Sequence, residues 1–335
     1  MIGLLLLAVA WAGGTRVVLQ EETVESIAAP LGGAPIAAAI RATNGLGPAE
    51  QPAVGTMLDL PEEVTDADCR PSYVASRHGE GSVRMPWGDE VPLDDLLPLP
   101  PGSEVCTGPE AFALLHLAEA VGDRDHDALT LLPGTCVVIR ASHVVGGRRN
   151  THVELSQGTV AVGEEELSGH LVVQTRAGLT VAERGGLRVA VEEEATRTEA
   201  IGGVALAVAQ GVQVDVPEGF GSRTRVGEAP GKPQPLPPAG VPTRPADGAE
   251  LRIPDLAWTP GERALGYFVE LSTSPGFDLL VLRARVGEPF WAPDWLLLPA
   301  DRGGLWWRIV SFDAAGFQGA PGPMRRVRIP TPVLP

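Results

Sequence analysis

Lysine is almost absent from this chain of 335 residues, in which Lys232 is the only example and arginine supplies the other basic side chains. Acidic residues outnumber basic ones by 42 to 26, so the formal net charge is -16. Binding to nucleic acid or to anionic lipid needs clustered positive charge. We therefore expect no nucleic-acid partner.

Long apolar runs and catalytic motifs are also missing. No segment is apolar over the roughly 20 residues that a membrane-spanning helix requires. The motifs H-E-x-x-H, G-x-S-x-G and G-x-x-x-x-G-K-[ST] do not occur, so the sequence shows no visible zinc-protease, hydrolase or phosphate-loop site. We expect a protein with no enzymatic activity and no cofactor. Its length and its hydrophobic content of 44% are enough for two or three folded domains.

The beginning of the chain is apolar from Ile2 to Ala12 and ends in the small-x-small pattern Ala10-Trp11-Ala12. This arrangement is typical of a secretory signal peptide and its cleavage site. We expect residues 1–12 to be removed and the mature protein to be exported to the periplasm or cell envelope. A buried first strand or helix is the alternative interpretation.

Residues 13–62 show the pattern of a small β-α-α-β unit. Apolar residues recur with helical spacing after Thr23, a suitable N-cap, and Pro35 follows Gly32-Gly33 where a second helix can begin. Asn44-Gly45 is a typical helix end. The expected elements are a strand at 17–19, helices carrying Val24, Ile27, Ala28, Leu31, Ile36 and Ile40, and a strand at 57–60.

This unit resembles a LysM domain through the segments EETVESIA, RATNGLGP and VGTMLDLP. Glu21-Glu22-Thr23 stands where that family usually has Gly-Asp-Thr. The resemblance implies binding of peptidoglycan or another N-acetylglucosamine polymer in a shallow groove between two loops. The groove residues that it implies are Glu21, Glu22, Thr23, Asn44, Gly45 and Leu46.

Residues 72–228 read as many short strands separated by Gly, Pro and Asp, which is typical of a sandwich, barrel or solenoid. They resemble a FecR domain, and the turn and strand positions that match are Thr107-Gly108, Gln157-Gly158, Thr175 and Glu218-Gly219. In the regulators of that family, the domain relays the state of a receptor to a sigma factor, after a cytoplasmic helix and a membrane span. Neither element precedes the domain in this sequence. The resemblance therefore implies an all-β fold and not that signalling mechanism.

The stretch Gly185 to Gly211 alternates apolar and charged residues, as an antiparallel sheet does. We expect Leu187, Val189 and Val191 to face one way and Arg188 the other, with the apolar pattern resuming at Val204, Leu206 and Val208. The simplest interpretation of the charges is a solvated face, and a partner-binding surface is the alternative. The residues assigned to this face are Glu192, Glu193, Glu194, Arg197 and Glu199.

A proline-rich segment, 229–245, is expected to be an extended linker to a third domain at 246–330. That domain resembles a fibronectin type III or related immunoglobulin-like sandwich. We expect Trp307 and Ile309 to face its core and Arg308 to face water. Five of the seven tryptophans lie here, as core residues or, alternatively, as a carbohydrate platform at Trp291, Trp295 or Trp306.

Two groups of polar residues could be taken for metal sites. The cluster GDRDHDAL has the alternating aspartates of a calcium loop but lacks its glycine and final glutamate, so a polar hairpin tip is favoured. Five of six histidines lie between His116 and His170, near Cys106 and Cys136. Their spacing matches no zinc motif, and we expect no metal and mostly surface histidines.

The three cysteines are Cys69, Cys106 and Cys136. Cys106 and Cys136 each stand beside a threonine at the boundary of an expected strand, so neighbouring strands could bring them together in an exported protein. We expect these two to form a disulfide, and two buried thiols are the alternative.

Together these patterns predict a mainly β, multidomain fold. The favoured function is that of a non-enzymatic, exported cell-envelope protein attached to peptidoglycan through residues 13–62, with the FecR-like domain as scaffold or partner-binding unit. The alternative is an envelope signalling or receptor component that binds a protein partner through the FecR-like domain without binding glycan.

Overall fold

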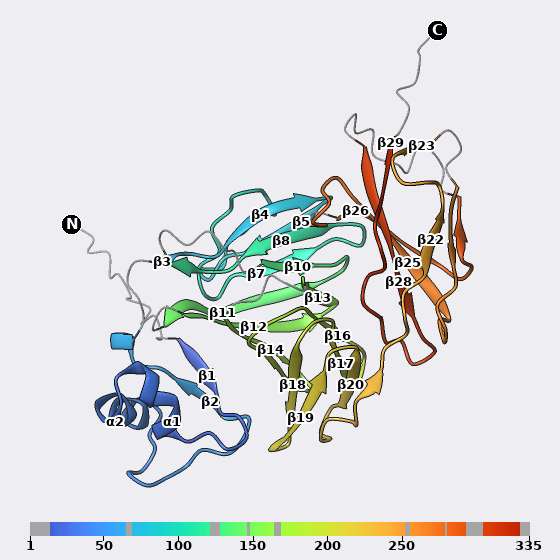
Figure 1. Ribbon diagram of the computed structural model, residues 1–335. Coiled ribbons are helices and arrows are strands. Elements are labelled where there is room, and N and C mark those ends of the chain that lie inside the picture. Colours follow the sequence, from blue (N-terminus) through green and yellow to red (C-terminus); the bar gives the residue numbers. More distant parts are fainter. Residues whose placement is uncertain are drawn as a thin grey trace, which may run out of the picture.

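The computed structural model describes residues 14–64, 69–120, 128–145, 148–163, 169–251, 255–278, 280–292 and 304–328. The chain is mainly β, as predicted, with its strands gathered in several sheets (Figure 1). The expected signal peptide, residues 1–12, lies outside the described residues. No helix in the described ranges combines the length and apolar character needed to cross a bilayer.

The N-terminal module, residues 14–64, has the predicted element order. It contains β1 (Thr15–Val17), α1 (Val24–Ala28), the 3-10 helices η1 (Ala29–Leu31) and η2 (Glu62–Val64), α2 (Ala34–Thr43) and β2 (Met57–Asp59). β1 pairs antiparallel with β2. Thr23 caps α1 as expected, because its side chain accepts from Ser26 N while the Ser26 side chain accepts from Thr23 N. The first strand begins two residues earlier than the sequence pattern suggested.

The module packs against the rest of the chain through apolar contacts. Its own core gathers the buried faces of both helices and of β2, and Val145 from the next domain joins this core. On its other side, Val17 of β1 is buried with Val172 and Val181 of a neighbouring sheet. The module is therefore docked on the outer face of that sheet, as Figure 1 shows at lower left.

The central domain, residues 69–236, consists of two large sheets. The eight-stranded sheet has the order β21-β20-β17-β16-β13-β10-β8-β4. Its strands are β4 (Tyr73–His78), β8 (Phe112–His116), β10 (Ala128–Leu131), β13 (Thr159–Val162), β16 (Leu187–Val191), β17 (Ala195–Ala200), β20 (Phe220–Arg225) and β21 (Gln234–Pro235).

The second sheet has nine strands in the order β19-β18-β15-β14-β12-β11-β7-β5-β6. They are β5 (Gly81–Arg84), β6 (Glu90–Pro92), β7 (Glu104–Thr107), β11 (Cys136–Val145), β12 (Arg148–Gln157), β14 (His170–Thr175), β15 (Gly178–Ala182), β18 (Val204–Ala209) and β19 (Val212–Pro217). A short pair, β3 (Cys69–Arg70) with β9 (Glu119–Ala120), lies beside these sheets. Within the nine-stranded sheet only β12 and β14 pair in parallel.

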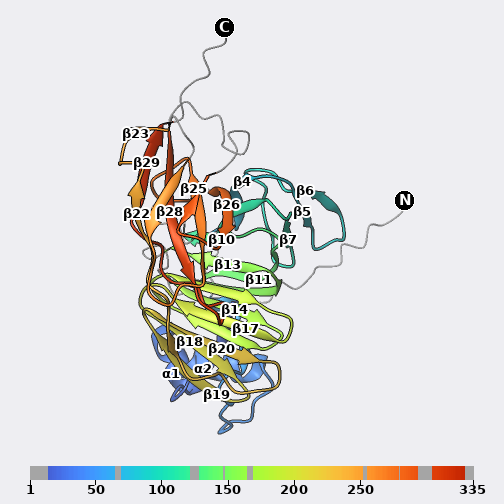
Figure 2. The same ribbon diagram turned by 90° about the vertical axis from the view of Figure 1, so that its right-hand side faces the viewer.

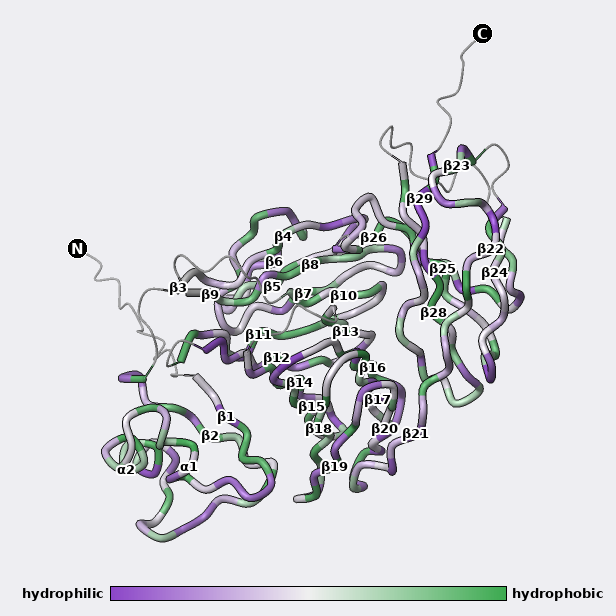
Figure 3. The backbone as a smooth tube through the Cα atoms, in the orientation of Figure 1, coloured by the Kyte–Doolittle hydropathy of each residue, from purple (hydrophilic) through white to green (hydrophobic). Residues whose placement is uncertain are grey.

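The two sheets share one apolar core, to which alternate residues of both contribute. Leu187 and Val189 of β16 are buried in it, opposite residues such as Val153 and Val173 from the other sheet. Figure 3 shows the hydrophobic residues that run along β8 and β10. The inward direction of Leu187 and Val189 is thus confirmed. On β18 the expected apolar pattern holds in part, because Val208 is buried and Leu206 packs partly buried against the cluster of Val17, whereas Val204 is exposed. The other face of this strand is also buried, at Ala205 and Ala207.

The proline-rich segment is not a free spacer. β21 extends the eight-stranded sheet by pairing with β20, and β22 (Val241–Arg244) already belongs to the C-terminal sandwich. Leu236, between them, is buried with Ile201 and Phe317. The expected linker 229–245 therefore joins the two domains along a packed path.

The C-terminal sandwich, residues 241–328, consists of a three-stranded and a five-stranded sheet, with the orders β22-β24-β27 and β23-β29-β28-β25-β26. Trp307 and Ile309 are fully buried between them, as predicted, whereas Arg308 is half-buried. Figure 2 shows the long strands of this sandwich beside the central domain. The further strands are β23 (Ala249–Glu250), β24 (Leu256–Thr259), β25 (Gly266–Ser272), β26 (Leu280–Val286), β27 (Phe290–Trp291), β28 (Leu305–Phe312) and β29 (Arg325–Arg328).

Candidate functional site

The segment that contains Glu21, Glu22 and Thr23 and the segment that follows α2 contact each other in the N-terminal module. The first loop is defined here as residues 18–23 and the second loop as residues 44–56. Gly55 N donates to Val18 O at 2.8 Å, and Val18 N donates to Thr56 O at 2.9 Å. Farther along, Val24 N donates to Gln51 Oε1 at 3.3 Å. The second loop is therefore bonded to both ends of the first loop, at Val18 and just after it at Val24.

Of the three residues expected from the first loop, only Glu21 is exposed for a ligand. Glu22 Oε1 lies 2.7 Å from Arg16 Nη2, and its Oε2 accepts from Leu19 N at 2.9 Å. Thr23 is occupied by the cap of α1. Glu21 has a φ of 67°, in the left-handed region that favours glycine. Glu22 and Thr23 thus shape the loop instead of facing solvent.

The expected residues of the second loop also have structural roles. Asn44 Nδ2 donates to Ile40 O and to Asp59 O, and Asn44 Oδ1 accepts from Asp59 N, each at 2.8 Å. This side chain ties the end of α2 to β2. Gly45, with a φ of 65°, turns the chain out of the helix, and Leu46 packs partly buried against the module core.

A buried arginine that the sequence analysis missed organises the junction of the loops. Arg41 is only 7% exposed, and it donates through Nη2 to Glu25 Oε1 at 2.7 Å and through Nη1 to Gly47 O and Glu50 O. Gln51 Nε2 donates to Glu25 Oε2 at 3.1 Å. The hydrogen bonds from Arg41 and then Gln51 lower the pKa of Glu25 to about 2. Arg41 is the only charged residue in the helix APIAAAIRAT, and this was the sequence signal that could have indicated its role.

The junction presents hydrogen-bonding groups to solvent. Gln20, Glu21 and Gln51 are exposed along it, and Pro52 is half-buried beside them. Amide and carboxylate groups of this kind can pair with the hydroxyl and amide groups of a neutral glycan. The first loop thus meets Gln51, Gly55 and Thr56, whereas Asn44 is bonded to Asp59, which pairs with Thr15 at the other end of β1 and β2. Most of the predicted residues hold the backbone, and few remain available to a ligand.

The expected disulfide partners are joined in the structure, between β7 and β11. Cys106 and Cys136 are directly opposite in the strand pairing, and a disulfide connects them. These two sulfurs are consequently not available as zinc thiolates. Among the residues that the structure describes, no group of three or more His, Cys, Asp or Glu side chains is placed to hold a metal ion.

Other expectations have mixed outcomes. The histidines were expected mostly at the surface, but His152 and His170 are each only 6% exposed, because both lie on strands of the nine-stranded sheet. Of the tryptophans considered for a carbohydrate platform, Trp291 and Trp306 pack partly buried against apolar clusters. Trp295 and the aspartates of GDRDHDAL lie outside the described residues.

The charged residues assigned to a solvated face are divided between solvent and a domain interface. Glu193 and Glu194 are exposed, as expected, but Arg197 is 8% and Glu199 only 1% exposed. That assignment was wrong for Arg197 and Glu199, because the loop between β28 and β29 covers this part of β17. Gln318 N, in that loop, donates to Glu199 Oε1 at 2.8 Å.

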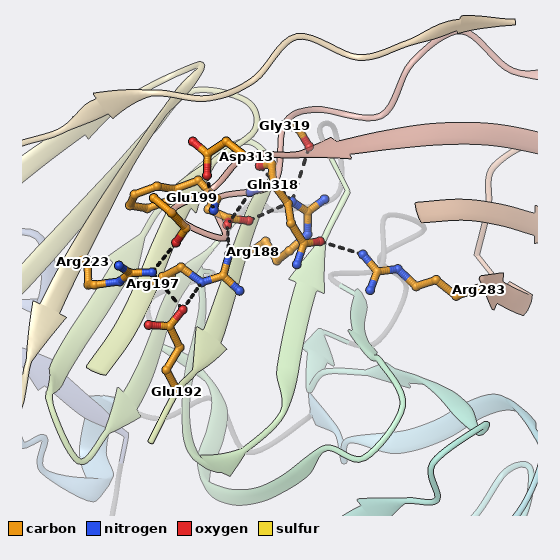
Figure 4. A network of polar contacts seen from close by, with 11 residues as sticks. Arg188, Glu192, Arg197, Glu199, Arg223, Arg283, Asp313, Gln318 and Gly319 are labelled. Carbon is orange, nitrogen blue, oxygen red and sulfur yellow. Dashed lines mark hydrogen bonds and ion pairs between the residues drawn. The ribbon is translucent and has the colours of Figure 1, made fainter. Parts of the chain in front are cut away.

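Figure 4 shows the resulting network. Arg188 Nη1 donates to Glu199 Oε2 at 2.8 Å and to the carbonyl oxygens of Gln318 and Gly319, at 3.2 and 3.4 Å. Arg197 Nη1 donates to Glu199 Oε1 at 2.9 Å. Arg283 Nη2, from the C-terminal sandwich, donates to Gln318 Oε1 at 2.6 Å. The network joins the central domain to the C-terminal sandwich.

No family model matches this chain, and no curated protein matches it. Among solved structures, a crystal structure of a candidate anti-sigma factor from Parabacteroides distasonis is similar over 39% of this chain, with 13% sequence identity and a TM-score of 0.32. The chain spans 59% of the length of that protein.

Proposed function

We propose that this protein is a non-enzymatic, exported cell-envelope protein that binds a polymer of N-acetylglucosamine, such as peptidoglycan, through its N-terminal module. The main support for this proposal is the junction of the first and second loops, where the resemblance to LysM domains implies a glycan groove. There Glu21 and Gln51 are exposed on a backbone that Arg41 and Asn44 hold in place. The β-domains that follow act as a rigid support for this module.

Two features of the junction support a glycan as ligand. Its exposed groups are uncharged amides and a carboxylate, which hydrogen-bond to sugar hydroxyl and acetamido groups. Its backbone is fixed before binding by the Gly55–Val18 and Val18–Thr56 hydrogen bonds. A preorganised surface loses less conformational entropy when a ligand binds, so even a shallow groove can have useful affinity.

The test uses the mature full chain and a substitution that fills the junction. Ala53 is exposed on the second loop, so Ala53→Trp places a bulky ring there without removing a buried contact. Ala38→Trp, on the exposed side of α2, is the matched control. We expect the wild type and Ala38→Trp to sediment with purified peptidoglycan and to bind a soluble chitin oligosaccharide. Ala53→Trp should bind at least about ten-fold more weakly, equivalent to about 1.4 kcal/mol.

A cellulose oligosaccharide, which lacks the acetamido group, should bind more weakly than the chitin fragment. Equal sedimentation of both tryptophan variants would place wall binding elsewhere in the chain. If the wild type binds neither sacculi nor chitin fragments, the glycan proposal is wrong, and the protein-partner function of the central domain becomes the next hypothesis to test.

A further inference from the structure

A cavity of about 680 Å³ lies between the N-terminal module and the nine-stranded sheet, beside their apolar contact. Its volume lies within the range of small-molecule pockets, roughly 300–1,000 Å³. The apolar wall comes from the module and the end of β11. The polar wall comes from β12, β14 and the segment after β15, together with Arg16 and Glu22 of the module. The apolar wall includes Ile27, Pro30, Leu31 and Val145.

The polar wall is rich in arginine, although the whole chain is strongly acidic. Four arginines and two glutamates line the cavity: Arg16, Arg148, Arg149, Arg184, Glu22 and Glu183. Both glutamates contact the same arginine, since Glu22 lies 2.7 Å and Glu183 3.3 Å from Arg16. Arg148 and Arg184 stand exposed at the rim. The cavity therefore favours an anion.

Among the residues that the structure describes, the buried atoms Oδ1 of Asn150 and Nε2 of His170 have no hydrogen-bond partner, and both residues line the cavity. Each of them is only 6% exposed. The two residues are directly opposite each other in the parallel pairing of β12 with β14. Buried polar groups in native proteins are nearly always satisfied, by protein, water or a ligand. The Asn150–His170 pair is therefore the part of the cavity best suited to hydrogen-bond a ligand.

The chemistry of the pair can be assigned from its neighbours. Arg16 Nη1 lies 2.9 Å from His170 Nδ1, and because an arginine can only donate, Nδ1 is an acceptor and the ring proton is on Nε2. Glu183 Oε1 is farther from Nδ1, at 3.5 Å, and accepts from Arg16 instead. Burial lowers the pKa of His170, which keeps the ring neutral. The pair thus offers one donor, Nε2–H, beside one acceptor, Oδ1.

We infer that this cavity binds a small carboxylate that has a hydroxyl or amide group near the carboxylate. The carboxylate pairs with the rim arginines, because guanidinium groups match its two oxygens. The neighbouring hydroxyl or amide donates to Asn150 Oδ1 and offers an oxygen to His170 Nε2–H. Sugar acids and the acylated carboxyl end of a peptide share this chemistry. The site lies apart from the exposed residues of the glycan junction, although Glu22 of the first loop also lines the cavity.

The experiment titrates the full chain with D-glucuronate and with N-acetyl-D-alanine, using D-glucose as the neutral comparison, by calorimetry. We expect at least one carboxylate to bind with a Kd below about 1 mM and glucose at least about ten-fold more weakly. Tighter binding of glucuronate identifies a sugar acid as the class, and tighter binding of N-acetyl-D-alanine identifies a peptide end. If neither carboxylate binds with a Kd below about 1 mM, the inference is wrong. An ordered water would then be the hydrogen-bond partner of Asn150 Oδ1 and His170 Nε2.

Exposed rim residues provide variants that should fold. Arg148→Gln and Arg184→Gln are each expected to weaken carboxylate binding about ten-fold. Arg225→Gln is the matched control, because Arg225 is also exposed but does not line the cavity. Ala53→Trp should leave carboxylate binding unchanged, which separates this site from the glycan junction. If Arg225→Gln weakens binding as much as the rim variants, the attraction is general and the inference is wrong.

A spectroscopic measurement tests the buried pair without altering it. In protein labelled with ¹⁵N-histidine, the His170 Nε2 resonance should shift on addition of the bound carboxylate and stay unchanged with glucose. Binding that leaves this resonance unmoved would contradict the part assigned to His170 and Asn150.

Discussion

Arg188 and Glu199 form an ion pair of 2.8 Å between neighbouring strands of the central domain, and both side chains are almost completely buried beneath the C-terminal sandwich. They are directly opposite each other in the pairing of β16 with β17. Because Arg188 also donates to the Gln318 and Gly319 carbonyls, the pair fixes the position of one domain on the other.

Removal of Glu199 should therefore destabilise the domain interface. Glu199→Ala leaves Arg188 and Arg197 buried without their shared carboxylate, and breaking a buried pair in this way costs about 3–5 kcal/mol. Glu194→Ala, at an exposed position in the turn between β16 and β17, should change stability by less than about 0.5 kcal/mol. Urea unfolding followed by tryptophan fluorescence checks both, and equal midpoints would contradict the role of the network.

A second buried carboxylate makes stability depend on pH. Burial by itself would raise the pKa of Glu270, but the positive charges of Arg308 and Arg283, at 2.8 and 2.9 Å, outweigh it and lower this pKa to about 2. A depressed folded-state pKa gives stability that is present above the ordinary value of 4.5 and is lost as the pH falls towards 2.

The measurement compares the wild type with Glu270→Gln by urea unfolding between about pH 7 and pH 3. At neutral pH the wild type should be more stable, by an amount on the order of 3 kcal/mol. The difference should shrink steadily below about pH 4.5, near the ordinary glutamate pKa. A difference that is independent of pH would show that the ionised carboxylate contributes nothing to stability.

The disulfide closes a loop between residues 30 apart in the sequence. Replacing both Cys106 and Cys136 by serine should lower the free energy of unfolding by about 3–4 kcal/mol, through the lost loop-closure entropy of the unfolded chain. Peptide mass spectrometry of the exported, unreduced protein should find the Cys106–Cys136 link. Reduced thiols at both positions, or a link from either one to Cys69, would refute this pairing.

Glu21 occupies a backbone conformation better suited to glycine, with a φ of 67°. Glu21→Gly should relieve a steric cost of about 1–2 kcal/mol while adding about 0.5–1 kcal/mol of unfolded-state entropy, so a small net gain in stability is expected. Gln20→Gly is the control, since the φ of Gln20 is not positive and only the entropy is changed. In thermal unfolding, Glu21→Gly should have a higher melting temperature than the wild type and Gln20→Gly a lower one. The reverse order would show that the backbone at Glu21 is not strained.

Much of the fold could be predicted because it depends on local chemistry. The cap at Thr23, the breaks at Gly32-Gly33 and Asn44-Gly45, and the inward face of Leu187 and Val189 follow from side-chain capping, backbone freedom and strand periodicity. These effects act over a few residues, so a single sequence displays them.

The sites depended on contacts between residues far apart in the chain. Alternation placed Arg188 and Glu199 on the outer face of their sheet, but only the docking of a segment more than a hundred residues later made that face an interior. Asn150 and His170 likewise share a cavity because β12 and β14 pair in parallel and the N-terminal module covers them. The sequence by itself determined most helix ends, turns and strand faces. Tertiary packing decided which of their polar faces meet solvent, because burial depends on what the rest of the chain places over them.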